Sequence, residues 1–430
     1  MKSELDRGIG KTVDWRLVAC WALLVVIGVM NIFATIQGED PSSIFDMDTR
    51  SGKQIMWFGI SAVVAVLVLF ALSPQLWKML SVPLYAVVVL LLFLVIFLSS
   101  DIKGSHSWFS LGPVSFQPAE VSKITTSLLL AAFMSRQNYK MSRRNDLFGT
   151  LAILLLPMAA ILLENETGSM LVYVGFLFVL YREGLSGWFI FILGACILLF
   201  IMTLIAGRVV ALILLGVMVA FWLLSSMHRR WKSVNIRRTH IRRSLLCLAA
   251  GAALVFGTEF AFNNILKDHQ RVRIEVLLGM KEDIQGAGYN VHQSKIAIGS
   301  GGLFGKGFLH GTQTAYGFVP EQSTDFIFCT VGEEWGFLGC LFVIAVYGLL
   351  IFWILEDAED SREGFTRIYG YCLASCLFMH LFINVGMTIG LMPVIGIPLP
   401  YVSYGGSSLL SFTVMLFIFI ALDRQEKKYF

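Results

Sequence analysis

The sequence predicts an all-α polytopic membrane protein with about twelve transmembrane helices and both termini in the cytoplasm. Of its 430 residues, 57% are hydrophobic and only 14% are charged, and the mean hydropathy is +0.74. This composition excludes an ordinary soluble domain. Apolar runs of about 18 to 25 residues, long enough to cross a bilayer, recur from end to end. Basic residues gather in alternate connecting segments, as positive-inside topology requires.

The predicted spans follow one another along the whole chain. The first is not followed by a small-residue cleavage site, so we interpret it as a retained span and not as a signal peptide. The twelve spans are Trp15–Ile36, Gln54–Leu72, Met79–Leu98, Pro118–Ser135, Phe148–Leu163, Gly168–Tyr181, Gly187–Ile205, Val209–Met227, Leu245–Phe262, Asp325–Leu355, Ile368–Met392 and Ser407–Leu422.

Lys and Arg residues set the predicted orientation. They cluster in the N-terminal segment, in residues 136–144, in residues 228–243 and after residue 423, whereas the short loops on the other side hold few. The positive-inside rule therefore places both termini in the cytoplasm. The basic run at residues 228–243 joins two spans, so a topology anchor that touches anionic membrane lipid is favoured over a nucleic-acid site.

One loop on the outer face, residues 263–324, is much longer than the others there. Loops of this length are usually functional or disordered, and the interleaved apolar residues and glycines argue against disorder. Nucleoside triphosphates are absent outside the cytoplasmic membrane, so chemistry there requires a substrate that already stores energy, such as a lipid-linked pyrophosphate. Such a substrate requires a carboxylate to accept a proton, cations for the phosphates and a membrane groove for the lipid.

The long loop supplies side chains of these kinds. Its run "GSGGLFGKG" superficially resembles a phosphate-binding loop, but Ser300 and Gly307 break the Walker pattern. Tight turns and close backbone approach are the two interpretations left for these glycines. The carboxylates are Glu282 and Asp283, the cations are Arg271, Arg273, Lys295 and Lys306, and the titratable partners are His292 and His310.

Ionisable residues also occur in or near the spans. In "FQPAEVSK", Glu120 and Lys123 are three residues apart and share one helix face. They form either a functional pair or an ion pair that orients the helix. Asp325, Glu333 and Glu334 in "TDFIFCTVGEEWG" raise the same question, as do His380 and Asn384, and for the two glutamates we favour an interior hydrogen-bonded network.

A third stretch, "GLMPVIGIPLPYVSYGGSS" (residues 390–408), is rich in proline and glycine at the outer end of a span. It cannot continue a regular helix, and irregular backbone at this depth is tolerated only when protein shields it or when it lines a cavity. We expect it to pack beneath the long loop.

Together these stretches resemble the SEDS family of cell-wall polymerases, and its rod-shape branch (RodA) more than its division branch (FtsW). The resemblance implies a peptidoglycan glycosyltransferase that joins lipid II units outside the cytoplasmic (inner) membrane. It implies a class B penicillin-binding protein and other elongation-complex proteins as partners. We expect no nucleotide, organic cofactor or nucleic acid. The matching text is "KGSHSWFSLGPVSFQPAEVSK", "GAGYNVHQSKIAIGSGGLFGKGFLHGTQ", "VPEQSTDFIFCTVGEEWGFLG" and "NVGMTIGLMPVIGIPLPYVSYGGSSLL".

The resemblance also assigns roles to residues. Asp283, which stands before "IQGAGY", is implied to be catalytic, either as a general base or as a ligand of a divalent cation such as Mg²⁺ or Mn²⁺. The family's "QPSE..K" pattern gives Glu120 and Lys123 a role at the substrate. Further expected substrate contacts are Lys295, Arg271 and Lys306, and structural or partner roles are expected for Glu166 (in "NETGS"), Trp108, Asp325 and Glu333.

The chain departs from the family pattern at three points. Ser107 stands where the family has Arg before Trp108, and Ile284 replaces the Pro after Asp283. The family has ten spans, so we interpret residues 187–244 as an inserted transmembrane hairpin with a basic cytoplasmic loop, within one membrane domain that covers residues 1–430.

Two other functions fit part of the pattern. A lipid II flippase would also use broken helices and buried ionisable residues. However, the apolar runs show no obvious two-fold repeat, and the informative residues cluster outside the membrane. A non-catalytic scaffold of the elongation machinery is the third interpretation.

Overall fold

A computed structural model shows the arrangement of most of the chain. It divides into two compact units: unit 1 is Met1–Gly184 together with Tyr289–Phe430, and unit 2 is Leu185–Gly288. We describe each unit by itself. The structure describes residues 13–36, 43–99, 107–111, 114–229, 234–266, 271–272, 274–275, 278, 280 and 287–429.

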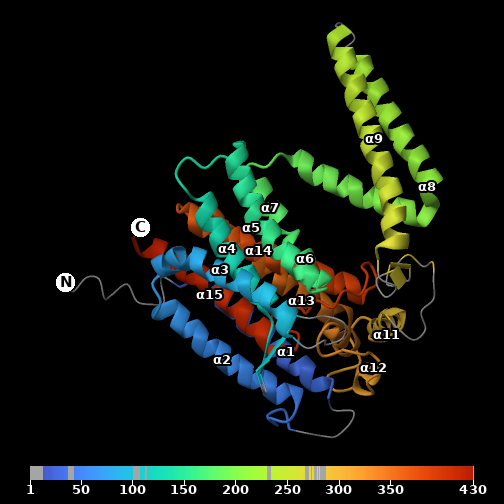
Figure 1. Ribbon diagram of the computed structural model, residues 1–430. Coiled ribbons are helices and arrows are strands. Elements are labelled where there is room, and N and C mark those ends of the chain that lie inside the picture. Colours follow the sequence, from blue (N-terminus) through green and yellow to red (C-terminus); the bar gives the residue numbers. More distant parts are fainter. Residues whose placement is uncertain are drawn as a thin grey trace. The chain divides into compact units, whose positions relative to one another are not determined.

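Unit 1 is a bundle of long helices (Figure 1). In α14 and α15, 78% of the apolar stretch is buried, against 28% in α2 and α3. The first two are therefore interior helices, and the other two expose apolar side chains, as lipid-facing helices do. The helices are α1 (Trp15–Ala34), α2 (Arg50–Phe70), α3 (Pro74–Leu98), α4 (Pro118–Met134), α5 (Arg144–Leu163), α6 (Thr167–Tyr173), α7 (Phe176–Arg182), α11 (Ala287–Ser300), α12 (Thr312–Ala315), α13 (Ile327–Asp360), α14 (Gly364–Thr388) and α15 (Gly406–Tyr429).

The predicted multi-pass helical fold is confirmed, because each of the twelve predicted spans lies largely in helix. Among the described residues, nine helices are long and apolar enough to cross a membrane. Three differences explain why this number is lower than twelve. Helix α8 covers two predicted spans but counts once, although a kink divides it. Helix α4 has only 17 residues, and the sixth predicted span is split into the two short helices α6 and α7.

Local sequence explains where several helices begin. The side chain of Asp14 accepts a hydrogen bond from the Arg16 amide at 2.9 Å and caps α1. Thr49 caps α2 in the same way. Pro74 and Pro118 occupy the first turns of α3 and α4, where the missing N–H costs nothing.

A short ribbon precedes α4 and was not predicted. Strand β1 (Phe109–Leu111) pairs antiparallel with β2 (Val114–Phe116), and Phe109 lies opposite Phe116. The ribbon leads directly into the segment that carries Glu120 and Lys123.

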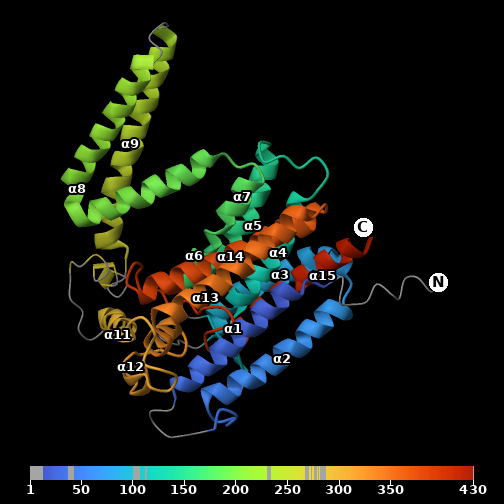
Figure 2. The ribbon, with the colours of Figure 1, turned by 180° about the vertical axis from the view of Figure 1, so that it is seen from behind.

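Unit 2 contains α8 (Gly187–Arg229) and α9 (Val234–Asn264). Helix α8 is interrupted at Gly207, whose φ of 80° lies in the region that favours glycine. The second part of α8 runs beside α9 (Figures 1 and 2), and the Arg208 guanidinium lies 3.2 Å from the Glu259 carboxylate. The interpretation of residues 187–244 as an inserted hairpin stays a prediction.

The short helices of the long loop lie at one end of unit 1. Both views place α11 and α12 at the end opposite the C-terminus (Figures 1 and 2). The proline-rich segment between α14 and α15, which we call the Pro-rich loop (Pro393–Gly405), begins shortly after α14 ends at Thr388.

Candidate functional site

The predicted catalytic residue, Asp283, lies outside the described residues, as do Glu282 and Arg273. Arg271 belongs to unit 2, where its guanidinium lies 3.3 Å from the Glu275 carboxylate and is partly exposed. The other predicted site residues that the structure describes, apart from Arg271, belong to unit 1.

Glycines bring the long loop into direct backbone contact with α13. A Cβ atom on Gly301 would lie 2.0 Å from the Gly332 carbonyl oxygen, and one on Gly305 would lie 2.1 Å from the Glu334 carbonyl oxygen. The helix is kinked there at Gly336, which has a φ of 66°. Only residues without a side chain allow this approach.

Hydrogen bonds close the same contact. The amides of Lys306 and Gly307 donate to the carbonyls of Glu333 and Glu334 at 3.0 and 2.9 Å. In return, the Phe337 amide donates to the Gly302 carbonyl at 2.9 Å. Because these amides are engaged with α13, the run "GSGGLFGKG" serves close packing and not phosphate binding.

Glu333 lies at the centre of a buried network. Its side chain is fully buried, and its carboxylate accepts hydrogen bonds from the amides of Thr312, Gln313 and Thr314 at 2.8 to 2.9 Å. It also accepts from the Thr314 hydroxyl at 2.8 Å and from Lys306 Nζ at 2.6 Å. The carboxylate thus holds α12, which begins in the "HGTQ" motif, onto α13. Lys306 therefore binds Glu333, whereas the sequence led us to expect a contact between Lys306 and the substrate.

Helix α11 docks on the C-terminal end of α14. The Ser294 hydroxyl donates to the Thr388 carbonyl at 2.9 Å. Lys295 is exposed, and its Nζ lies over Gly390, where an added Cβ would be 2.5 Å away. Lys295 is therefore a cation that remains accessible at this end of unit 1.

The Pro-rich loop is shielded by protein, as expected. Asn384 on α14 donates to the carbonyls of Ile397 and Asp325 at 2.7 and 2.8 Å. The Ser403 hydroxyl donates to the Thr324 carbonyl at 2.6 Å. The Asp325 carboxylate lies 3.3 Å from where a Cβ on Gly396 would be. These bonds fix the irregular backbone beneath the segment that follows α12.

Glu120 and Lys123 form a buried ion pair on α4. Lys123 Nζ lies 2.7 Å from Glu120 Oε1, and the side chains are 1% and 3% exposed. Isolated charges are very costly away from water, so each of these two requires the other. The second carboxylate oxygen, Oε2, is buried and has no hydrogen-bond partner among the described residues.

His380 completes this pair, a connection that sequence spacing did not reveal. Its Nε2 lies 2.9 Å from Lys123 Nζ, and its Nδ1 lies 2.9 Å from the Pro398 carbonyl oxygen. The Phe412 ring lies 5.1 Å from Lys123 Nζ and packs edge-to-face on His380. Three helices and the Pro-rich loop therefore meet at Lys123.

A further acidic pair lies at the turn between α5 and α6. The Ser107 hydroxyl donates to Glu166 Oε1 at 2.7 Å, so the residue that replaces the family Arg contacts the "NETGS" acid directly. Trp108, next to it, is half-buried. Glu164 is fully buried, and neither carboxyl oxygen has a hydrogen-bond partner among the described residues. Burial, assisted by the nearby Glu166, raises the pKa of Glu164 to about 8.

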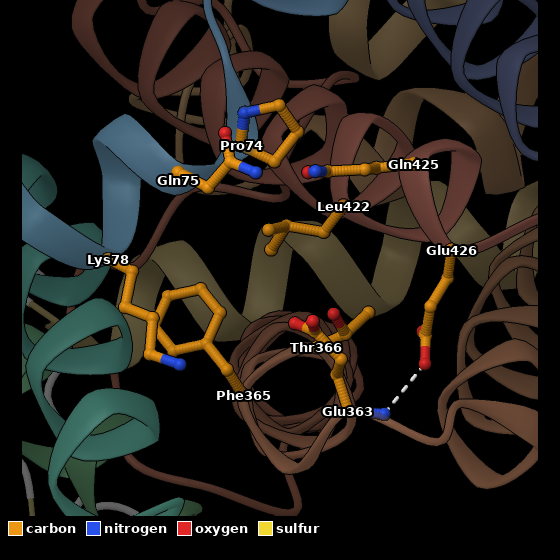
Figure 3. Close-up of a pocket in the computed structure, with 9 residues that line it drawn as sticks. All are labelled: Pro74, Gln75, Lys78, Glu363, Phe365, Thr366, Leu422, Gln425 and Glu426. Atoms are coloured by element: carbon orange, nitrogen blue, oxygen red, sulfur yellow. Dashed lines mark hydrogen bonds between the residues drawn. The ribbon is translucent and has the colours of Figure 1, made fainter. Parts of the chain in front are cut away.

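A separate pocket of about 250 Å³ lies near the C-terminus (Figure 3). It is formed by the first turns of α3 and α14 and the last turns of α15, and the Glu363 amide donates to Glu426 at its edge. It lies at the end of α15 remote from the Pro-rich loop and is separate from the candidate site. Its lining residues are Pro74, Gln75, Lys78, Glu363, Phe365, Thr366, Leu422, Gln425 and Glu426.

Within the described part of the chain, no group of three or more His, Cys, Asp or Glu side chains is arranged to hold a metal ion. The expected divalent cation at Asp283 therefore stays a prediction.

The chain is similar to bacterial cell-wall enzymes over nearly its whole length. It is 33% identical to the peptidoglycan glycosyltransferase MrdB of Escherichia coli over 399 residues, 93% of this chain and 90% of that one. It is 29% identical to the peptidoglycan glycosyltransferase RodA of Treponema pallidum over 96% of this chain and 98% of that one. A solved structure described as "Structural coordination of polymerization and crosslinking by a peptidoglycan synthase complex" matches with a TM-score of 0.68, 25% identity and coverage of 96% and 98%.

The family model described as "Cell cycle protein", which covers FtsW, RodA and SpoVE, matches residues 14–213 and 239–428. Of the residues 214–238 between the two matched ranges, the described ones lie in the second part of α8 and the start of α9. Because the match covers well over half of the chain, the protein belongs to the FtsW/RodA/SpoVE (SEDS) family, within which RodA proteins are among its similar relatives.

Proposed function

We propose that this multi-pass membrane protein is a peptidoglycan glycosyltransferase that polymerises lipid II for cell elongation. The observation that carries the proposal is the similarity to MrdB and RodA over more than nine tenths of the chain. The geometry agrees with it, because the long loop and the Pro-rich loop are anchored together at one end of the helical bundle.

In the proposed reaction, Asp283 is the general base. It removes the proton from the 4-hydroxyl of the GlcNAc of the acceptor lipid II. The resulting oxygen nucleophile attacks the anomeric carbon of the MurNAc on the donor chain. The bond to the lipid pyrophosphate breaks, and the configuration inverts from α to β. In the alternative role, Asp283 holds a Mg²⁺ or Mn²⁺ ion, which would supply positive charge for the pyrophosphate.

A cation that binds the leaving pyrophosphate needs N–H groups that are not already bonded to protein. Lys123 donates to Glu120 and His380 and faces the Phe412 ring, and Lys306 is bound to Glu333. We therefore assign the pyrophosphate contact to the exposed Lys295, together with a divalent cation, and give Lys123 an internal role. Arg271 stays a proposed contact on unit 2.

The proposed location is the inner membrane, with the long loop on the extracytoplasmic face. The distribution of Lys and Arg supports this side. A class B penicillin-binding protein is the proposed partner, and the likeness to a peptidoglycan synthase complex supports it.

The test is polymerisation of purified lipid II by the protein in detergent, with and without the penicillin-binding partner. Detergent micelles have no two sides, so a flippase would leave lipid II unchanged, and a scaffold would do the same. We expect muramidase-sensitive glycan chains on a gel. Unchanged lipid II, under conditions in which a relative such as MrdB makes polymer, would refute the proposal.

A further inference from the structure

The buried cluster around Lys123 determines which atoms carry protons. An ammonium group can only donate, so His380 Nε2, 2.9 Å away, must accept and carries no hydrogen. A carbonyl oxygen can only accept, so Nδ1, 2.9 Å from the Pro398 oxygen, carries the hydrogen. Beside a charged Lys123, His380 is therefore a neutral imidazole with one defined tautomer.

Every N–H of Lys123 has a partner in this arrangement. One points to Glu120 Oε1 at 2.7 Å and one to His380, and the Phe412 ring receives the third as a cation–π contact. Glu120, Lys123, His380 and Phe412 are each at most 3% exposed. Without His380, the ammonium would lose one of three contacts in a place that water does not reach.

His380 also connects the ion pair to the Pro-rich loop. The next residue on the same face of α14, Asn384, binds the carbonyl of Ile397, and His380 binds the carbonyl of Pro398. Two adjacent peptide groups of the Pro-rich loop are thus fixed by side chains four residues apart on one helix.

We propose that His380 is a positioning residue for glycan polymerisation, which holds Lys123 on one oxygen of Glu120 and locks this pair to the Pro-rich loop. This inference rests on the proposed function. In the locked state Lys123 binds Oε1 of Glu120 and leaves Oε2 as an acceptor without a partner among the described residues. His380 itself acts through Lys123 and the loop and not on the reacting atoms.

The activity test compares two replacements of His380. His380→Gln keeps one donor and one acceptor, whereas His380→Phe keeps the ring shape and loses both. We expect His380→Phe to lower kcat for lipid II polymerisation by about tenfold or more with KM changed less than about threefold. His380→Gln should retain at least about a third of kcat. Phe382→Leu, on the exposed side of α14, is the control for a change on the same helix.

Equal kcat for His380→Phe and the wild type would overturn the inference and leave the proposed function intact. If the wild type itself makes no polymer, the proposed function fails instead. A readout independent of activity covers that case and any variant that does not fold.

That readout is nitrogen NMR of the protein labelled with ¹⁵N-histidine in lipid nanodiscs. Among the seven histidines, we expect a neutral one with a protonated Nδ1 and a bare Nε2, whose signals disappear in His380→Gln. If the signals lost on that substitution belong to an imidazolium or to the Nε2–H tautomer, His380 does not accept from Lys123 and the inference is wrong.

Discussion

Replacing Glu333 by Gln tests how the long loop is held on α13. The carboxylate is fully buried and accepts three backbone amides, the Thr314 hydroxyl and Lys306. Glutamine keeps one oxygen but turns an NH₂ group toward donors that need an acceptor. If the oxygen remains at the Oε1 position, the Thr314 amide loses its only acceptor in this network.

The magnitude follows from these contacts. One orphaned buried amide costs about 1–3 kcal/mol, and breaking a buried ion pair costs about 3–5 kcal/mol. Lys306 is 27% exposed, so water can hydrate its ammonium group once the ion pair is broken. The cost of breaking this pair therefore lies at the lower end of that range. We expect opening of the segment Lys306–Phe318 to become easier by about 3 kcal/mol. That corresponds to roughly 100-fold faster amide exchange.

The assay is hydrogen–deuterium exchange of peptides that cover Lys306–Phe318. Glu356→Gln is the control, because Glu356 lies on the same helix in a half-exposed pair with Arg16 and should change exchange in this segment by less than about threefold. Exchange in Glu333→Gln within about threefold of the wild type would refute the reasoning.

Two further variants test packing and burial. Gly305→Ala should lower the unfolding midpoint clearly more than Gly302→Ala. Both glycines have a positive φ, but only at Gly305 would the new Cβ lie 2.1 Å from a backbone atom. Equal unfolding midpoints for the two variants would contradict the close contact. Glu164→Gln should stabilise the protein increasingly as pH rises. Burial raises the pKa of Glu164 from 4.5 to about 8, so the unfolded chain loses this proton first and the wild type loses stability over that interval. The gain should grow by about 1 kcal/mol per pH unit between about pH 5 and 8, measured by chemical unfolding in detergent, and a gain that does not change with pH would show that Glu164 is ionised.

Local patterns were enough to predict much of the fold. Apolar length and basic loops identified all twelve segments, because hydropathy acts on each span separately. Proline and glycine content indicated that residues 390–408 leave the helix and need shielding, and Asn384 and Ser403 provide it. The ribbon β1–β2 was not predicted, because a strand of three residues is too short to show a clear alternation of apolar and polar side chains.

Contacts between distant residues could not be predicted in the same way. The spacing of Glu120 and Lys123 indicated a pair on one helix face, but His380 lies 257 residues away in sequence. Glu333 was expected in a hydrogen-bonded network, yet its partners come from a different segment, 19 to 27 residues earlier. Only the folded arrangement shows that Lys123 and Lys306 already bind protein groups, whereas the side chain of Lys295 is exposed.

The central claim is that Asp283 performs the chemistry of lipid II polymerisation. The most direct test is the initial rate of glycan formation by purified Asp283→Asn protein, with Asp268→Asn in the same loop as the matched control. We expect Asp283→Asn to be slower than the wild type by at least about 100-fold, the usual effect of losing a general base, and Asp268→Asn to stay within about twofold. Polymerisation by Asp283→Asn at the wild-type rate would contradict the account.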